Sequence, residues 1–477
     1  MPIQFPRCLL VFAVALGSAG CVPPRGQNTT PGSVVGILWD YEVSVDATGT
    51  TLSISGDLTG ASPLLGVDKG AEMFVSDFEV APYDATKAAL FQPVAREQEG
   101  WRADACTRRC RIRYRFRLVD AARAIQDSSR LQWVDGIVVG SASAWLVHPA
   151  PQASVRYRFR INAAPSGMHV VSGVAALSPD VYGAAATELE DGPYTAFGAF
   201  HRKTVVLGTS TLEVAITQDN RFLSDEAIIA WVVHSARTIQ SYLGFFPVER
   251  ALILATSSSF DDVRGQTSGG GGSAILLSIG TRATAWSLSK GGVLTHEMVH
   301  LALPYMTPLD QWFTEGLAVY IEAVARARAG DLDESAFWTH LQQHLPLGLP
   351  RHDEQGLRGA TRAGRVYWGG GLFFLLADLE VRQCTGNAHA IVDILRAVHA
   401  NGGSVAEHWT VDRTIDVGDA ATGTTTLRTL YEQMGKERVD TDLDALWAKL
   451  GLEFTREGIR FNNRAPWAEI RAAIMEH

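Results

Sequence analysis

Three residues in the second half of the chain have the types and spacing of a zinc site. His296, Glu297 and His300 lie in the segment GGVLTHEMVHLALP, whose apolar residues predict a helix. Histidines at positions i and i+4 share one helical face, so both imidazoles can reach a single tetrahedral zinc ion. Glu297 projects toward a water and not toward the ion. The pattern predicts metal-assisted hydrolysis with Glu297 as general base.

A third zinc ligand follows in the segment WFTEGLAVYIE. Its apolar residues recur at helical spacing, and antiparallel packing of this helix would bring Glu315 to the metal. Gly316 has no side chain, which suits a close approach of two helices. The alternative for Glu315 is a carboxylate that interacts only with the helix dipole.

A second histidine pair has the same spacing. His340 and His344 lie in THLQQH, but no acidic residue follows the first histidine and no third ligand is close in the sequence. Because metal sites need three protein ligands, we interpret these two as surface or interhelical histidines.

Composition and charge limit the classes of protein to which this chain could belong. The 477 residues include 42 Lys+Arg and 51 Asp+Glu, with a net charge of -9 and 46% hydrophobic residues. This composition is typical of a folded chain of two or more domains. An acidic balance without a basic tail argues against nucleic acid as the main partner. After residue 20, no run reaches the roughly 18 apolar residues of a membrane-spanning helix.

The N-terminus has the pattern of an export signal. Residues 1–20 contain Arg7, a short apolar run and then small residues, after which comes Cys21. Small residues before a cysteine are similar to a bacterial lipoprotein signal, although Ser18 stands where Leu is usual. We expect acylation of Cys21 and a lipid anchor in the cell envelope, with residues 21–33 as a flexible tether. The alternative is an ordinary secretory signal, which also exports the protein.

Residues 34–217 alternate with period two and predict a β-sandwich-like domain. Two strands, beginning near Arg111 and Arg156, alternate arginine with apolar residues, so one face of each carries guanidinium groups. This face either docks an anionic envelope polymer or partner protein, or is a solvated face offset by acids such as Asp77 and Glu79. Cys106 and Cys110 are close enough for a disulfide in an oxidising compartment, the alternative being a reduced pair.

Residues 218–400 change to a mixed pattern. A helix over 227–243 and strands over 251–256 and 274–279 precede a helical half, and residues 401–477 predict short helices. We expect the strand over 274–279 to offer main-chain groups to an extended peptide, as edge strands can. The predicted substrate-binding residues at its glycine-rich start are Gly271, Gly272, Ser273 and Ala274.

HEMVH followed by WFTEGLAVY resembles the gluzincins, the thermolysin-like metallopeptidases with a glutamate zinc ligand on a downstream helix. Further segments resemble the glycyl aminopeptidase family: LVHPAPQASVRYRFRIN with PSG, LEDGPYTAFGAF, and VYWGGGLFFLLADLEVRQCTGN. The resemblance spans about residues 140 to 400. It implies zinc on His296, His300 and Glu315, Glu297 as base, and Tyr367 as the residue that stabilises the oxyanion. The alternative for Tyr367 is a packed aromatic at a helix N-terminus.

The chain also departs from this family. The loop between His300 and Glu315 is shorter, and TSGGGGSAILL lacks the acid that holds a substrate's free amine. We expect short helices after about residue 401, in place of the family's usual C-terminal PDZ domain. A site without that acid should not prefer free N-termini, unless Asp261, Asp262 or Glu322 replaces it.

The sequence thus predicts an α+β protein: a β-sandwich-like domain followed by a thermolysin-like zinc peptidase domain with a mostly helical C-terminal half. The expected function is that of an exported, membrane-tethered peptidase acting on peptides or proteins. The alternatives are a non-catalytic zincin-fold binding lipoprotein and an aminopeptidase.

Overall fold

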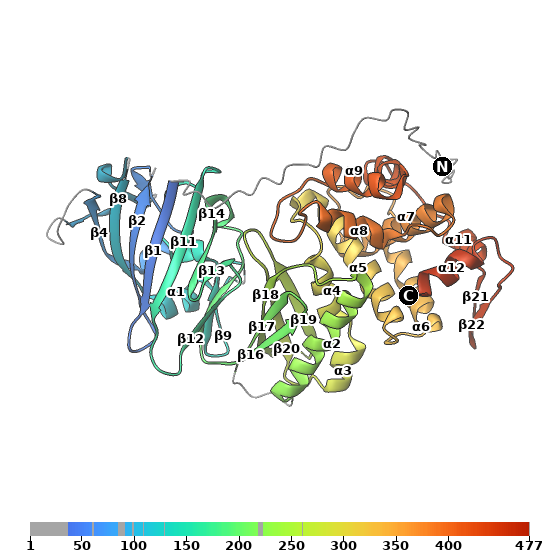
Figure 1. Cartoon of the computed structure of the whole chain (residues 1–477), viewed down its shortest axis with the longest axis horizontal. Helices are drawn as coiled ribbons and strands as arrows, with labels where there is room; N and C mark the ends of the chain where they lie inside the picture. The colour runs from blue at the N-terminus through green and yellow to red at the C-terminus, as the bar shows by residue number, and fades with distance from the viewer. Residues whose placement is uncertain are drawn as a thin grey trace, which may run out of the picture. The chain divides into compact units, whose positions relative to one another are not determined.

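The computed structural model describes residues 37–59, 62–83, 91–97, 100–107, 109–127, 129–217, 223–259 and 261–476. The predicted signal, tether and Cys21 lie outside these ranges. The chain forms two compact units that divide between Ala199 and Phe200 (Figure 1). This boundary precedes the predicted one at 217/218. The reason is that the two strands over residues 200–217 belong to the sheet of the second unit.

The first unit is rich in β-structure. Among the described residues, one sheet has the order β13-β14-β11-β1-β2-β8-β4-β5, a second has β12-β15-β10-β9, and a small third has β3-β7-β6. β1 pairs in parallel with β11 and antiparallel with β2. The strands are β1 (Ile37–Val45), β2 (Leu52–Thr59), β3 (Leu64–Leu65), β4 (Val75–Pro82), β5 (Gln92–Pro93), β6 (Arg96–Glu97), β7 (Gly100–Arg102), β8 (Arg109–Phe116), β9 (Leu131–Val134), β10 (Ile137–Gly140), β11 (Val155–Ala163), β12 (His169–Ser172), β13 (Ala176–Ser178), β14 (Val181–Ala185) and β15 (Thr195–Gly198).

The two larger sheets of this β-rich unit share one apolar core. Trp145 meets Phe159 of β11 and Phe197 of β15 edge-on, with ring centroids 5.3 and 5.6 Å apart. The buried hydroxyls of Tyr41 and Tyr114 donate to backbone carbonyls, so neither is left without a partner. The helices of this unit are α1 (Leu118–Ile125), η1 (Glu72–Phe74), η3 (Asp104–Thr107), η4 (Ala142–Ala144) and η5 (Ala186–Glu188).

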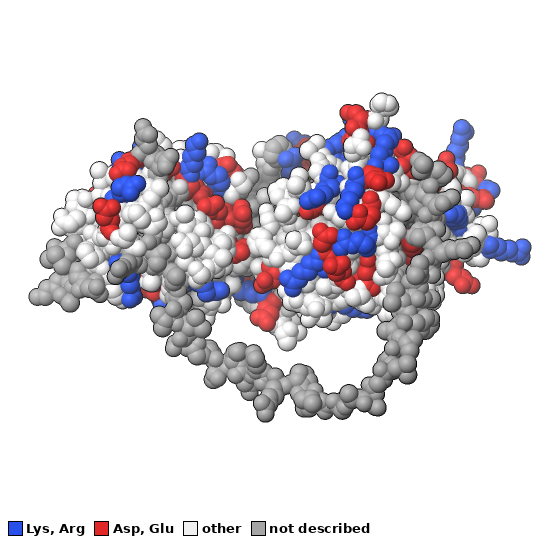
Figure 2. Space-filling model, turned by 90° about the horizontal axis from the view of Figure 1, so that it is seen from above, with Lys and Arg blue, Asp and Glu red and all other residues white. Residues whose placement is uncertain are grey.

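The arginine-bearing strands are β8 and β11, and their apolar residues are buried as predicted, except for the half-buried Ile161. Arginines of both strands meet acids on the neighbouring strand. Arg158 contacts Asp40 at 2.5 Å and Arg160 contacts Glu42 at 3.5 Å. Arg113 pairs with Glu79. Acidic and basic side chains are also interspersed on the face shown in Figure 2. These cross-strand pairs favour the solvated-face interpretation, with Glu79 as one of the predicted offsetting acids.

The structure joins Cys106 and Cys110 in a disulfide. Both cysteines are fully buried, at η3 and in β8, so the bridge lies within the core of the first unit.

The second unit begins with a five-stranded sheet of order β16-β17-β18-β20-β19. β17, β18 and β20 are parallel neighbours, and β19 is antiparallel to β20 at the edge. The predicted peptide-binding strand is therefore an interior strand, and that expectation is corrected: β20 pairs on both sides. The strands are β16 (Phe200–Leu207), β17 (Ser210–Thr217), β18 (Arg250–Ser258), β19 (Val263–Ser268) and β20 (Ala274–Gly280), with a hairpin of β21 (Leu452–Thr455) and β22 (Gly458–Phe461) near the C-terminus.

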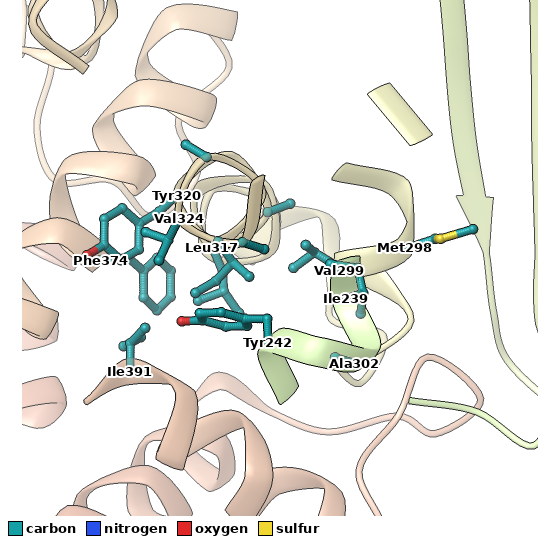
Figure 3. Packing of buried hydrophobic residues seen from close by; sticks show 14 of the residues in the cluster. Ile239, Tyr242, Met298, Val299, Ala302, Leu317, Tyr320, Val324, Phe374 and Ile391 are labelled. Carbon is teal, nitrogen blue, oxygen red and sulfur yellow. The ribbon is translucent and has the colours of Figure 1, made fainter. Parts of the chain in front are cut away.

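α2 lies between β17 and β18 in the chain, the other helices follow the sheet, and one core joins them (Figure 3). Val299, Leu317, Tyr320 and Phe374 pack in this core, which also includes Ile474. Residues 401–476 thus belong to the same unit as the helices before them, not to a separate segment as predicted. The helices are α2 (Asp225–Leu243), α3 (Ala285–Lys290), α4 (Val293–His300), η6 (Pro308–Asp310), α5 (Gln311–Arg328), α6 (Glu334–His344), η7 (Leu345–Gly348), η8 (Arg365–Gly369), α7 (Gly370–Thr385), α8 (Ile391–Ala400), α9 (Val411–Thr422), α10 (Thr426–Leu430), η9 (Tyr431–Gly435), α11 (Leu443–Leu450) and α12 (Ala468–Met475).

Across the described ranges, every helix is too short or too polar to cross a lipid bilayer.

Candidate metal centre

The three predicted zinc ligands come together on two adjoining helices. α4 buries Leu294, Met298 and Val299 in the core, which leaves the two histidines of the opposite face toward a cavity. Glu315 comes from the first turns of α5. The potential ligand atoms of His296, His300 and Glu315 all lie within 4.8 Å of one another.

The distances between these atoms fit a tetrahedral ion. His296 Nε2 lies 3.2 Å from Glu315 Oε2 and 3.2 Å from His300 Nε2, and His300 Nε2 lies 3.4 Å from Glu315 Oε2. Zinc bonds of about 2.0–2.1 Å place tetrahedral ligand atoms about 3.3–3.4 Å apart. Two imidazoles and one carboxylate are also a donor set that suits catalytic zinc.

Burial and charge keep the carboxylate ionised. Burial raises the pKa of Glu315, but hydrogen bonds from His296 and His300 outweigh it and hold that pKa well below its usual range. Burial lowers the pKa of His300, while the hydrogen bond and charge of Glu315 raise it, and the net direction is upward. Protons on this histidine will therefore compete with a metal ion at low pH.

Glu297 is held by the edge strand β19. Its side chain is buried, and the Thr267 hydroxyl lies 2.7 Å from Glu297 Oε2 and 2.9 Å from the Glu297 carbonyl oxygen. Gly265 lies two residues earlier on the same face of the strand. A Cβ at Gly265 would lie 2.4 Å from Glu297 Cγ, so only glycine leaves room for the glutamate in this position. β19 therefore both accommodates the predicted base and fixes its carboxylate.

Tyr367 projects into the same cavity from η8, a π-helical turn that leads into α7. Its ring stacks near His296, with centroids 6.2 Å apart. Burial, the charges of Glu315 and Glu297, and a hydrogen bond with Glu315 raise the pKa of Tyr367 to about 12. The phenol is thus a hydrogen-bond donor at neutral pH.

Helices α5 and α7 cross in close contact beside the site. A Cβ on Gly316 would lie 2.2 Å from the carbonyl carbon of Gly370, and a Cβ on Gly370 would lie 2.1 Å from the Trp312 carbonyl oxygen. The predicted close approach at Gly316 is confirmed, and its partner helix is α7. This crossing brings the N-terminal ends of α5 and α7 together. Glu315 lies near the start of α5, and Tyr367 lies in η8, immediately before α7.

A buried ion pair within α5 also contacts the end of α3. Arg326 Nη1 donates to Glu322 Oε1 at 2.5 Å, and Arg326 Nη2 donates to the Lys290 carbonyl oxygen at 2.8 Å. Both side chains are buried. Removal of one partner would leave the other charged and buried, so the loss of either should be strongly destabilising.

The predicted substrate-binding residues do not line the cavity. The Gly271 N–H donates to the Ala406 carbonyl oxygen, and the Ser273 carbonyl accepts from Leu252. Ala274 lies in the interior strand β20. The glycine-rich loop instead forms backbone hydrogen bonds with the segment 404–409, because the Gly270 N–H also donates to the Val405 carbonyl oxygen.

The cavity, of about 440 Å³, holds the metal-ligand group. Its wall comprises residues of β19, of α4 and α5, of the connection between these helices, and two residues from later in the chain. The lining residues are Gly265, Gln266, Thr267, His296, Glu297, His300, Leu303, Pro304, Tyr305, Met306, Thr307, Pro308, Gln311, Thr314, Glu315, Tyr367 and Val405.

Sequence reasoning missed the contribution of β19. The segment VRGQTS has few apolar residues and a glycine, so it did not stand out as a strand. The one usable signal was its period-two alternation immediately before the glycine-rich loop.

Comparison with known proteins gives similarity at the level of the fold. No protein-family model matches the chain, and no curated protein matches it. Among solved structures, an aminopeptidase N family protein from Idiomarina loihiensis has a TM-score of 0.62 at 13% identity, covering 87% of this chain and 78% of that one. An M1 zinc metallopeptidase from Deinococcus radiodurans has a TM-score of 0.53 at 15% identity, covering 86% and 95%.

A third similar structure is a point mutant of a two-domain M1 zinc metallopeptidase bound to L-tryptophan. Its TM-score is 0.52 at 16% identity, and the match covers 86% of this chain and 95% of that one. These likenesses show a shared fold: a β-rich N-terminal part and a mixed α/β part with a helical C-terminal half.

Proposed function

We propose that this protein is a zinc-dependent peptidase, with zinc held by His296, His300 and Glu315. The observation that carries the proposal is the convergence of these three side chains, at tetrahedral spacing, in a cavity that also contains Glu297. The fold shared with M1 zinc metallopeptidases supports the same reaction class.

When bound, zinc lowers the pKa of a water in its open coordination position to about 7 and polarises a carbonyl oxygen. Glu297 takes a proton from the attacking water, and a general base of this kind contributes about 10²- to 10⁴-fold. Thr267 keeps the Glu297 carboxylate in one orientation. The Tyr367 hydroxyl donates a hydrogen bond to the oxygen that becomes negative in the transition state.

The edge strand β19 is our candidate for binding the substrate's main chain. Among the described strands it pairs with β20 alone, and Gly265, Gln266 and Thr267 line the cavity. An extended peptide can add to an exposed strand edge of this kind. This proposal replaces the interior strand β20 in that role.

Digestion of a mixed peptide library by purified protein, with and without a chelator, tests the function. We expect cleavage that the chelator abolishes and added zinc restores, read by mass spectrometry. Freshly purified protein without zinc, and without uptake on reconstitution, would refute the metal site.

We also propose that the chain is exported and anchored by a lipid on Cys21, which lies outside the described residues. The support is the sequence pattern of small residues before this cysteine. Cys21→Ser should move the protein from the membrane fraction to the soluble fraction. Unchanged fractionation would reject the anchor.

A further inference from the structure

The charges that line the cavity are all committed to the catalytic centre. The ionisable lining residues, apart from Tyr305 and Tyr367, are His296, Glu297, His300 and Glu315. Among the described residues, no Lys, Arg or Asp lines the cavity. The Glu315 carboxylate is bound by both histidines, and Glu297 is the proposed base, so neither is free to hold a substrate charge.

The acids that could replace a missing amine-binding residue lie outside the cavity. Glu322 is buried against Arg326, and Asp261 is exposed and pairs with Arg282 at 3.5 Å. The Asp262 backbone accepts from Gly280 beside the end of β20. None of the three lines the cavity. The structure therefore gives no carboxylate for a substrate ammonium and no cation for a substrate carboxylate in the described wall.

Part of the wall is apolar. Leu303, Pro304, Met306 and Val405 line it, and Leu303 and Met306 are almost fully buried. Such a surface gains from an apolar side chain and gives no compensation for a desolvated charge.

We infer that the enzyme is an endopeptidase that cleaves within apolar, uncharged segments of a peptide, and does not trim free N- or C-termini. The inference rests on the proposed peptidase function and adds its substrate class. A terminal ammonium or carboxylate next to the scissile bond would lose its hydration without finding a partner, which disfavours exopeptidase binding. An internal segment places neutral amides at both ends of the cavity instead.

The test uses one peptide of about a dozen residues with an apolar centre, prepared with each end free or blocked by acetylation and amidation. For zinc-loaded full-length protein we expect the same internal cleavage site in all four forms, with kcat/KM within about threefold. A second set carries Lys or Asp beside the scissile bond, and we expect at least about a tenfold loss, the scale of one unpaired charge in a binding site. Glu297→Gln is the matched control, because cleavage that survives in it comes from a contaminant.

The outcomes separate the two proposals. Cleavage that requires a free N-terminus or a free C-terminus, or that tolerates charge beside the bond, would overturn the endopeptidase inference and leave the peptidase function intact. No chelator-sensitive cleavage of any peptide by zinc-loaded protein would overturn the proposed function, and the inference with it.

Discussion

The chain contains two histidine pairs at the same helical spacing, and their surroundings give them different roles. His296 and His300 on α4 direct their Nε2 atoms toward each other and toward Glu315, within 3.2 to 3.4 Å. His344 on α6 donates from Nδ1 to the His340 carbonyl oxygen at 2.8 Å, and both rings pack on Trp368.

Burial also acts differently on the two pairs. It lowers the pKa of His340, whereas Glu315 reverses this effect at His300. The i, i+4 spacing alone is therefore not a metal site. Two features distinguish the first pair from the second. The first pair has a third ligand on another helix, and its two Nε2 atoms face each other, whereas the Nδ1 atom of His344 is bound to a backbone carbonyl.

The largest expected effect comes from removing one histidine of the first pair. His300→Ala should lower zinc content from about one ion per chain to below about a tenth and abolish peptide cleavage, because only two protein ligands remain. His344→Ala is the matched control, and should keep both zinc and activity. Metal analysis and peptide cleavage assays measure the two effects. Equal loss in both variants would contradict the distinction between the pairs.

The next change separates catalysis from metal binding within the first pair's helix. Glu297→Gln keeps the size of the side chain but removes the base, so zinc content should be unchanged while kcat falls about 10²- to 10⁴-fold. Steady-state kinetics and metal analysis on the same preparation check this. A variant that cleaves as fast as the parent would exclude Glu297 as the base.

A smaller effect is expected at the strand that holds this base. Thr267→Val keeps the shape but removes the hydroxyl, and should lower kcat about tenfold with little change in KM or zinc content, since a hydrogen bond to a charged group is lost. Thr267→Ser should restore kcat, because serine retains the donor. If serine fails to rescue, the methyl group and not the hydroxyl accounts for the loss.

The smallest effect concerns a pair of acids that has no ligand role. Burial and the charge of Asp419 raise the pKa of Glu380 on α7 to about 7. Because the pKa of Glu380 is higher in the folded state than in the unfolded state, its protonation favours folding. This contribution to stability is full below about pH 4.3 and is lost as the pH rises through about 7. Glu380→Gln should therefore raise the free energy of unfolding by about 1–3 kcal/mol at pH 8 relative to the parent, and much less at pH 5. Urea unfolding at the two pH values measures the difference, and a gain independent of pH would contradict the titration.

The sequence alone was sufficient to predict the features that depend on a local pattern of residues. Helical spacing placed His296, His300 and Glu315, and period-two alternation identified β8 and β11. Long-range pairing was not predictable in this way. The interior position of β20 depends on β19, a short polar strand, and the division of the chain at Ala199 depends on the pairing of β17 with β18. The role of Thr267 depends on the same strand, because only its docking against α4 brings the hydroxyl to Glu297.

The segment 404–409 has a consequence for the order in which the chain is made. Val405 forms part of the cavity wall, and this segment bonds both to the glycine-rich loop and to Leu301 and Tyr305. Synthesis proceeds from the N-terminus, so α4 and α5 leave the ribosome long before the segment that completes the wall. We expect a chain that ends before residue 404 to have an open, incompletely shaped cavity, so the site is complete only when nearly all of the second unit is present.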